Sequence, residues 1–199
     1  RVIFLNCLFL LIAKSVDTVG KDNKFFALTV AAALNNPHKT NTGRVQLVPY
    51  RRGAPLPFVS AARHLLSAAD GKLRTDDRIE NIRRAAEVAG LFRDAGLVTL
   101  CTFISPFAAG RAEARRIADG RFLEVWVRAG LETCKARDPK KLYQKALEGK
   151  IRSFTGIDSP YEEPTDAELV LDTEVLSEEE CVSRLTDAIF DYLEGGDTL

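Results

Sequence analysis

The sequence contains no Met and begins at Arg1, so we expect a fragment, a processed form or the product of an incorrect gene model. It has two histidines, His38 and His64, and four cysteines that are far apart and form no CxxC pair. This pattern argues against a zinc site. It favours cysteines that remain reduced and pack as small apolar side chains. The cysteines are Cys7, Cys101, Cys134 and Cys181.

The chain also lacks net charge, because 28 Lys and Arg balance 28 Asp and Glu. Proteins that coat a nucleic-acid backbone usually carry a basic excess, so we expect no nucleic-acid partner. The N-terminal apolar run, residues 2–13, is too short to span a bilayer, and we expect no membrane partner. Two interpretations of this run stay open: the core of a signal peptide, or a buried first strand.

The charge is unevenly distributed along the chain. Residues 1–60 hold eight Lys and Arg against two Asp, whereas residues 61–199 hold 20 basic and 26 acidic residues. We therefore predict an atypical N-terminal segment at 1–60 and a domain at 61–199. Within the first segment, residues 25–34 could form a short buried helix. Residues 35–57 show no sustained period, which indicates loop or disorder.

From residue 77 onward, helical and strand patterns alternate. Asp77 with Glu80 resembles a capping box and starts a helix that Gly96 would end, and Ser177 with Glu180 forms a clearer box for the last helix. Apolar runs between them predict strands. The pattern indicates an α/β fold of three layers, α/β/α, around a mostly parallel sheet. The predicted strands are 97–104, 122–127 and 169–171, and the further predicted helices are 111–118 and 131–137.

Sheets of this class bind ligands at the carboxyl ends of their strands, which directs attention to Ser105 and Pro106. Arg78 and Asn81 share one face near a helix N-terminus, a combination suited to an anion and the edge of a nucleotide. The alternative is a solvated Arg and a neutral Asn on a surface turn. The polar, basic connection 137–161 is long enough for a lid, or it is an ordinary solvated surface segment.

Five segments carry a family resemblance: DDRIENIRRAAEVAGLFRDAGLV, FISPF, ARDPKKLYQKALEGKI, FTGIDSPYEEP and ELVLDT. Together they resemble the adenylyl-sulfate kinase family, including the kinase half of bifunctional PAPS synthetases. The resemblance spans about residues 63–195. It implies a P-loop nucleotide kinase fold with a lid. It also implies transfer of the γ-phosphoryl group of ATP, with Mg2+, to the 3′-hydroxyl of adenosine 5′-phosphosulfate (APS), giving PAPS.

The resemblance assigns roles to particular residues. Arg78 and Asn81 match contacts to the sulfonucleotide, and Ile104 and Ser105 match the strand-end pair at the same site. In some members the serine of this motif is described as phosphorylated, which gives Ser105 a second implied role. Arg63 also aligns with a sulfonucleotide contact.

The connection 137–161 carries further implied roles. Lys140 matches the lid lysine, Phe154 matches the aromatic residue that stacks near the adenine, and Arg137 matches a lid arginine on the ATP side. The family usually has Gly at the positions of Lys141 and Ser153, so both are side-chain additions beside the ligand. Members often dimerise, which implies a homodimer. Plastid, mitochondrial and cytosolic forms all occur, so the compartment is open.

The sequence departs from the family at the phosphate-binding loop. The motif GxxxxGKS/T, which cradles phosphates and binds Mg2+, occurs nowhere in the 199 residues. Two family aspartates align with Phe58 and Ser60. We therefore expect an adenylyl-sulfate kinase by descent with impaired turnover, through an incorrect gene model or a divergent inactive paralogue. The alternatives are a non-catalytic sulfonucleotide-binding or regulatory protein, and a kinase acting on another nucleoside phosphate.

Overall fold

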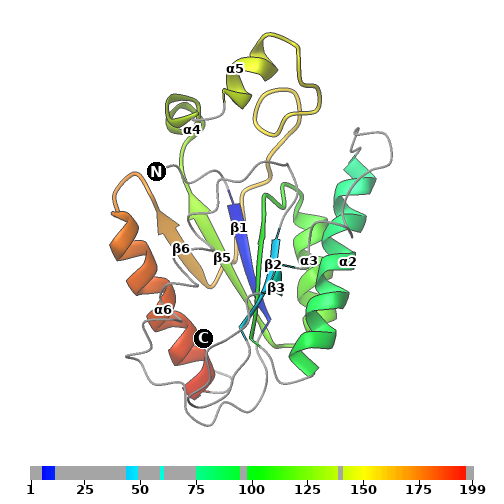
Figure 1. Ribbon diagram of the computed structural model, residues 1–199, viewed down its shortest axis with the longest axis vertical. Coiled ribbons are helices and arrows are strands. Elements are labelled where there is room, and N and C mark those ends of the chain that lie inside the picture. Colours follow the sequence, from blue (N-terminus) through cyan, green and yellow to red (C-terminus); the bar gives the residue numbers. More distant parts are fainter. Residues whose placement is uncertain are drawn as a thin grey trace.

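A computed structural model describes residues 6–11, 44–48, 59–60, 75–94, 98–138 and 141–195 (Figure 1). The described strands form one sheet in the order β3-β2-β4-β1-β5-β6. They are β1 (Asn6–Leu11), β2 (Arg44–Val48), β3 (Val59–Ser60), β4 (Val98–Phe103), β5 (Phe122–Arg128) and β6 (Leu169–Asp172). The described helices are α2 (Thr75–Asp94), α3 (Ala108–Ala118), α4 (Leu131–Arg137), α5 (Leu142–Leu147) and α6 (Glu178–Gly195).

Helices cover both faces of the sheet. Figure 1 shows α2 and α3 side by side on one face and α6 on the other, which confirms the predicted three-layer α/β fold. Strands β4, β5 and β6 run in the same direction, as expected, because β4 and β5 both pair antiparallel with β1 and β6 pairs parallel with β5. The sheet is nevertheless mixed, since β1 and β2 run against them. A short apolar strand can satisfy its ladder in either direction, so its composition did not reveal this.

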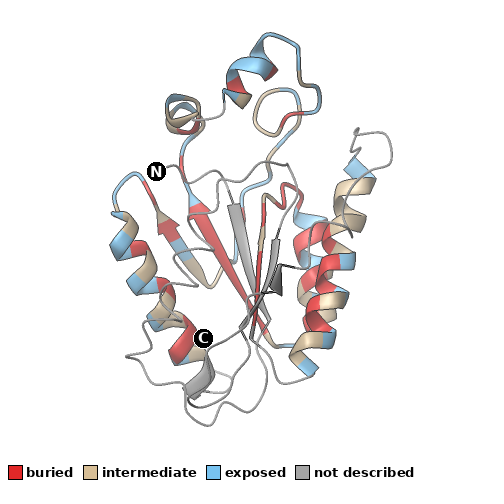
Figure 2. Ribbon diagram, in the orientation of Figure 1, coloured by how far each residue is buried: buried red, intermediate tan, exposed pale blue. Residues whose placement is uncertain are grey.

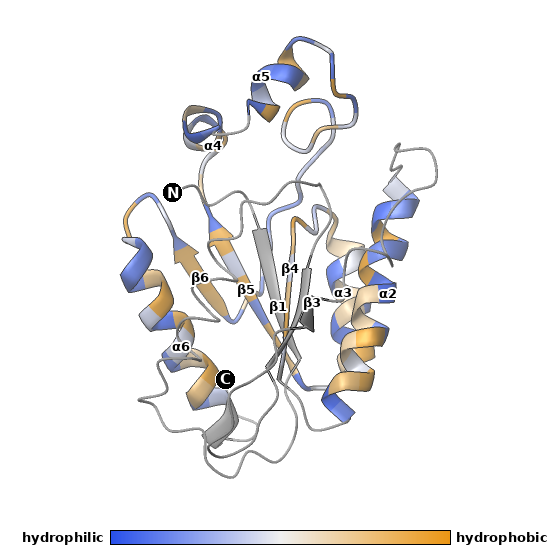
Figure 3. Ribbon diagram, viewed as in Figure 1, coloured by the Kyte–Doolittle hydropathy of each residue, from blue (hydrophilic) through white to orange (hydrophobic). Residues whose placement is uncertain are grey.

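The middle of the sheet is buried on both faces, as Figure 2 shows for β5. Side chains alternate across the sheet, so each face builds its own cluster. On one face, Leu123 and Val125 of β5 pack with Leu185 and Ile189 of α6. On the other, residues of β4 and β5 pack against α2 and α3; they are Cys101, Phe103, Phe122 and Trp126. Figure 3 shows the corresponding hydrophobic residues in β5 and β6.

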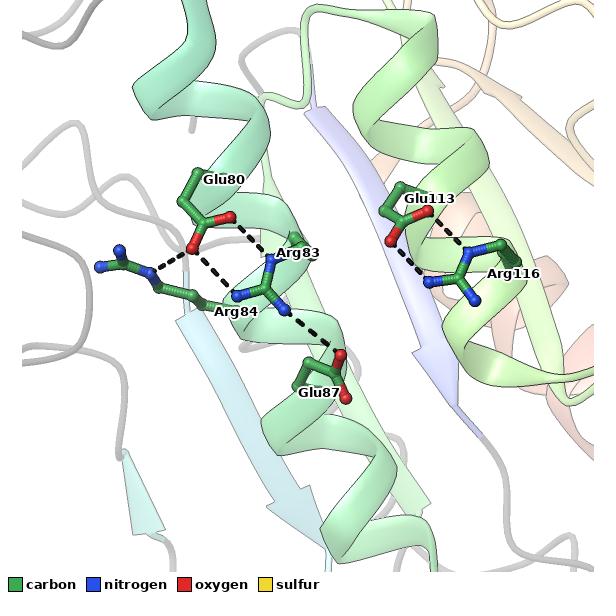
Figure 4. Close-up of polar contacts among 6 residues, drawn as sticks. All are labelled: Glu80, Arg83, Arg84, Glu87, Glu113 and Arg116. Carbon is green, nitrogen blue, oxygen red and sulfur yellow. Dashed lines mark hydrogen bonds and ion pairs between the residues drawn. The ribbon is translucent and has the colours of Figure 1, made fainter.

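The N-terminus of α2 differs from the predicted capping box. The helix begins at Thr75, two residues before Asp77, so Asp77 lies in its first turn rather than at its cap. The Glu80 carboxylate accepts hydrogen bonds from Arg83 and Arg84 instead (Figure 4). These bonds lower the pKa of Glu80 to about 2, the bond from Arg83 being the largest cause. The Glu80 carboxylate therefore pairs with arginines about one helical turn away instead of capping the backbone at the start of the helix.

The capping box of α6 is confirmed. The Glu180 amide donates to Ser177 Oγ at 3.2 Å, and the Ser177 amide donates to Glu180 Oε2 at 2.7 Å. The described elements match the other predicted helices and strands from 97 onward to within a few residues. In the part of the chain that the structure describes, no helix combines the length and apolarity needed to cross a bilayer.

The N-terminal segment 1–60 is described only in its three short strands. β1 falls inside the apolar run 2–13 and pairs on both sides, which supports the strand interpretation of that run. The prediction of loop or disorder for 35–57 is wrong at β2, because the alternating sequence RVQLV pairs with β4. The predicted helix at 25–34 lies outside the described residues, and the proposed division of the chain at residue 60 stays a prediction.

Residues 129–161, called the lid from here on, project beyond the carboxyl ends of β4 and β5 (Figure 1). Its described parts include α4 and α5. It has a small hydrophobic cluster of its own, formed by Ala129, Cys134, Tyr143, Ala146 and Phe154. Part of the lid is therefore helical, since α5 lies inside the predicted connection 137–161.

Candidate functional site

Arg78 joins the first turns of α2 to the lid. Its Nη1 donates to Thr155 Oγ1 at 3.1 Å and to Ser159 Oγ at 3.2 Å, and its Nη2 donates to the Ser153 carbonyl oxygen. Partial burial lowers the pKa of the Arg78 guanidinium, against the opposing attraction of Asp158. The predicted anion-binding arginine thus lies where a helix N-terminus meets the lid.

The lid turn that receives Arg78 is organised by a carboxylate. Asp158 accepts hydrogen bonds from the amides of Ser153 and Phe154. These backbone bonds, first that of Phe154, lower the pKa of Asp158. Gly156 adopts a φ of 84°, in the left-handed region that glycine enters freely, and its amide donates to the Ser159 carbonyl oxygen at 2.8 Å. The segment 153–159 is therefore a compact turn rather than an extended strap.

Ser105 occupies the turn directly after β4. It is 3% exposed and has a φ of 43°, a left-handed conformation that non-glycine residues seldom adopt. Its carbonyl oxygen accepts a hydrogen bond of 2.8 Å from Arg111 Nη1. Its hydroxyl is buried and has no hydrogen-bond partner within the residues that the structure describes. Ile104, before it, is partly buried.

Glu162 connects the Ser105 turn with the end of the lid. The Glu162 amide donates to the Pro106 carbonyl oxygen at 2.8 Å, and the Glu162 carboxylate accepts the Ala108 amide at the start of α3. Segment 153–162 therefore contacts α2 through Arg78 at one end and the strand-end turn at the other. The predicted Arg78 and Ser105 positions thus border the same stretch of chain.

Phe154 lies inside the lid cluster. Its ring meets Tyr143 edge-to-face, with ring centroids 4.9 Å apart and an interplanar angle of 75°. Phe154 is 8% exposed, and burial is the largest cause that raises the pKa of Tyr143. The implied stacking of Phe154 near an adenine stays a prediction, since in this structure the described partner of the ring is Tyr143.

Arg137 lies inside the lid, at the end of α4. Its Nη1 donates to Thr173 Oγ1 at 2.9 Å and its Nη2 to the Thr173 carbonyl oxygen at 2.8 Å, so it holds α4 to the loop after β6. Its implied role beside ATP stays a prediction. Asn81 is partly buried one turn beyond Arg78. Lys140 and Arg63 lie outside the described residues.

The two positions where the family usually has Gly have a backbone explanation. Lys141 has a φ of 53° and Ser153 a φ of 55°, both left-handed. Glycine occupies this region without the steric cost that a Cβ atom brings. We expected side-chain crowding beside the ligand from these positions, but the structure shows strain in the main chain itself.

The described residues do not fit a magnesium–nucleotide site by themselves. Within the described ranges no three His, Cys, Asp or Glu side chains gather as metal ligands. The phosphate-cradling motif GxxxxGKS/T is missing from the whole sequence. The implied binding of ATP and Mg2+ therefore has no described counterpart in this chain.

Sequence inspection missed a buried charged network beneath the site. Arg111 on α3 pairs with Glu124 on β5, their side chains 5% and 3% exposed and the Nε–Oε1 distance 3.1 Å. Arg115 pairs with Glu124 at 3.2 Å and also with Glu168. A lone carboxylate in the apolar strand FLEVWV was the available signal, because charges are buried only when paired.

Comparison with known proteins agrees with the geometry. The Mycobacterium tuberculosis APS kinase CysC, solved in complex with AMPPNP and APS, superposes with a TM-score of 0.52 at 38% identity, over 63% of this chain and 72% of that chain. A probable adenylyl-sulfate kinase of Halalkalibacterium halodurans is 56% identical over 124 residues, 62% of this chain and 61% of its own length. The adenylyl-sulfate kinase of Clostridium acetobutylicum is 48% identical over 126 residues, 63% of this chain and 61% of its own length.

The fold, which the chain shares with the solved APS kinase, is an α/β domain of the P-loop kinase type. The chain belongs to the adenylylsulphate kinase family, whose sequence model matches residues 60–172. The chain spans about 61% of the length of the two curated relatives, from Halalkalibacterium halodurans and Clostridium acetobutylicum.

Proposed function

We propose that this chain binds adenosine 5′-phosphosulfate at the carboxyl ends of β4 and β5 and is an adenylyl-sulfate kinase by descent. In that role its family chemistry is phosphorylation of the 3′-hydroxyl of APS by ATP. The observation that carries the proposal is the position of Arg78. It is a half-buried cation at the N-terminal end of α2 that faces the segment FTGIDSPYEEP of the lid.

Arg78 has the chemistry that a phosphosulfate group needs. The guanidinium carries five N–H donors and prefers anionic oxygens, whereas its described acceptors Thr155, Ser159 and Ser153 are neutral. An APS phosphate or sulfate oxygen is a stronger acceptor than these hydroxyls. Asn81 stands one turn further along α2, where its amide can read a polar edge of the ligand.

Retained substrate binding and impaired phosphoryl transfer belong together in this proposal. Phosphoryl transfer depends mainly on positioning and charge neutralisation, and the missing GxxxxGKS/T motif would supply both for the donor triphosphate. Loss of one such electrostatic contact typically costs 10²- to 10³-fold in rate, roughly. We therefore expect turnover far below that of an ordinary kinase. ATP and Mg2+ remain the donor and metal expected from the family, and AMPPNP in the solved relative supports the nucleotide alone.

The first test is calorimetric titration of the chain with APS. We expect wild-type binding and a loss of about tenfold in affinity for Arg78→Met, equal to about 1.4 kcal/mol for one charged contact. Arg84→Met is the matched control, since Arg84 lies on the same helix and bonds Glu80 (Figure 4). Equal weakening by both variants, or no binding by the wild type, would contradict the proposal.

The second test is a coupled assay for ATP-dependent PAPS formation. Rates near those of ordinary kinases would refute the predicted impairment while leaving APS as substrate. Binding of APS without measurable turnover would favour the second candidate, a non-catalytic sulfonucleotide-binding or regulatory protein, which the missing phosphate-loop motif supports. A preference for AMP over APS would favour a kinase for another nucleoside phosphate.

We also propose a homodimer, in keeping with the family, and test it by sedimentation analysis at several protein concentrations. A mass that stays that of one 22.0 kDa chain at all concentrations would contradict it. The proposed compartment is cytoplasmic or organellar, and fluorescent tagging of the complete gene product would decide between the two.

A further inference from the structure

A fully buried ion pair lies directly under the Ser105 turn. Arg111 is 4% exposed and Glu124 is 2% exposed. Burial is the largest cause that raises the pKa of Glu124, and the neighbouring Arg115 and Arg111 oppose it. Removing two charges from water costs free energy, and apolar residues of similar volume at the same positions often give a fold that is at least as stable. The pair is therefore weak evidence for a purely stabilising role.

Arg111 also donates a hydrogen bond to the candidate site, through its Nη1. While Nε faces Glu124 Oε1 at 3.1 Å, Nη1 donates to the Ser105 carbonyl oxygen at 2.8 Å. The planar guanidinium holds both directions at once, so Glu124 fixes the angle at which Arg111 reaches Ser105. The strand β5 thereby sets the position of a turn that follows β4.

Ser105 needs such support, because its backbone conformation is unfavourable. A non-glycine residue at a φ of 43° persists only where the surroundings impose it. Arg111 holds the residue's own carbonyl, and Glu162 holds the Ala108 amide three residues later. The turn is thus fixed from the helix side and from the lid side.

The hydroxyl that this turn presents lacks a partner. Ser105 Oγ is buried and makes no hydrogen bond to any residue that the structure describes. Buried hydroxyls are nearly always paired, so an orphaned one at the carboxyl end of a strand indicates a group that a ligand satisfies. A strained backbone at the same residue is a second, independent sign of a functional position.

We propose that Arg111 is a positioning residue of the sulfonucleotide site: it holds the Ser105 carbonyl so that the Ser105 hydroxyl faces the bound nucleotide. The inference rests on the proposed function, because the hydroxyl matters only if APS binds here. Glu124 acts one step further back by fixing Arg111. Arg115 neutralises the same carboxylate but has no described contact with Ser105.

A double-mutant cycle on APS affinity tests this. The variants are Arg111→Leu, Ser105→Ala and the two combined, measured by calorimetry at a temperature well below each unfolding midpoint. We expect each single variant to weaken APS about tenfold, and the double variant to be no weaker than the worse single one. Arg115→Leu is the matched control, expected to lower the unfolding midpoint yet leave APS affinity within about twofold.

Each outcome decides a different statement. An APS affinity of Arg111→Leu equal to that of the wild type would overturn the positioning role while the proposed function stands. The same holds if the two losses of APS affinity add in the double variant. Failure of the wild type to bind APS would overturn the proposed function and this inference with it. If Arg111→Leu does not fold, Arg111→Leu/Glu124→Gln takes its place, because it removes both charges of the pair. Normal APS affinity in that folded variant would also overturn the inference.

Discussion

Replacing Arg78 by Met should loosen the lid in a measurable way. The side chain of Met keeps much of the apolar stem but removes all three hydrogen bonds that α2 makes to segment 153–159. A hydrogen bond from a charged donor contributes about 1.5–3 kcal/mol when buried. Arg78 is only half buried and its acceptors are neutral, so we take about 2 kcal/mol for the set. This corresponds to about a 30-fold larger population of the opened lid.

Native-state hydrogen exchange followed by mass spectrometry measures that population. The informative amides are those of Ser153 and Phe154, which the Asp158 carboxylate accepts in the closed turn. We expect their exchange to accelerate about 30-fold in Arg78→Met. Exchange in α6 should stay unchanged, since Arg78 has no described contact there. Unchanged exchange of the lid amides, or equal acceleration in the control Arg84→Met, would refute the reasoning.

Three further predictions concern backbone strain, pH and the core. Lys141→Gly and Ser153→Gly should each raise the free energy of unfolding by up to about 1 kcal/mol in denaturant titrations, because both positions are left-handed. The hydrogen bond from the Phe154 amide lowers the pKa of the Asp158 carboxyl in the folded protein. The carboxylate should therefore stabilise the fold fully above pH 3.8 and lose this contribution as the pH falls below that value. The unfolding midpoint of Asp158→Asn should accordingly depend less on pH in the acidic range. Leu185→Ala should cost about 2–5 kcal/mol, since Leu185 is 0% exposed. A smaller loss would indicate that the cluster collapses into the space.

The strong local patterns were sufficient to predict most of the fold. The run LVTLCTFI and the run FLEVWV became β4 and β5, because a continuous apolar stretch suits a strand covered on both faces. The side chains of Ser177 and Glu180 each accept a hydrogen bond from the other residue's amide, so the capping box correctly predicted the start of α6. Asp77 and Glu80 show the limit of the same rule: two arginines within one turn gave the Glu80 carboxylate better partners.

The sequence supplied candidate site residues, whose roles stay predictions, but it did not supply their contacts. Arg78 and Ser105 follow from a helix start and a strand end, which are local features. Their common neighbour, segment 153–162, and the pair of Arg111 with Glu124 depend on tertiary packing between elements far apart in the sequence. The direction of β1 and the strand β2 also escaped prediction, since neither the apolar run nor the short alternation carries information on its pairing partner.

The separate hydrophobic cluster of the lid has a mechanical consequence. Tyr143, Ala146 and Phe154 bury one another within residues 129–161, so their packing does not depend on the sheet below. A pivot of this preassembled unit therefore exposes little new apolar surface. Polar contacts between the lid and the rest of the fold resist such a movement; they include the hydrogen bonds of Arg78, of Arg137 and of Glu174. Polar contacts of this kind can break and re-form, and can free the turn 153–159, while the hydrophobic cluster of the lid stays packed.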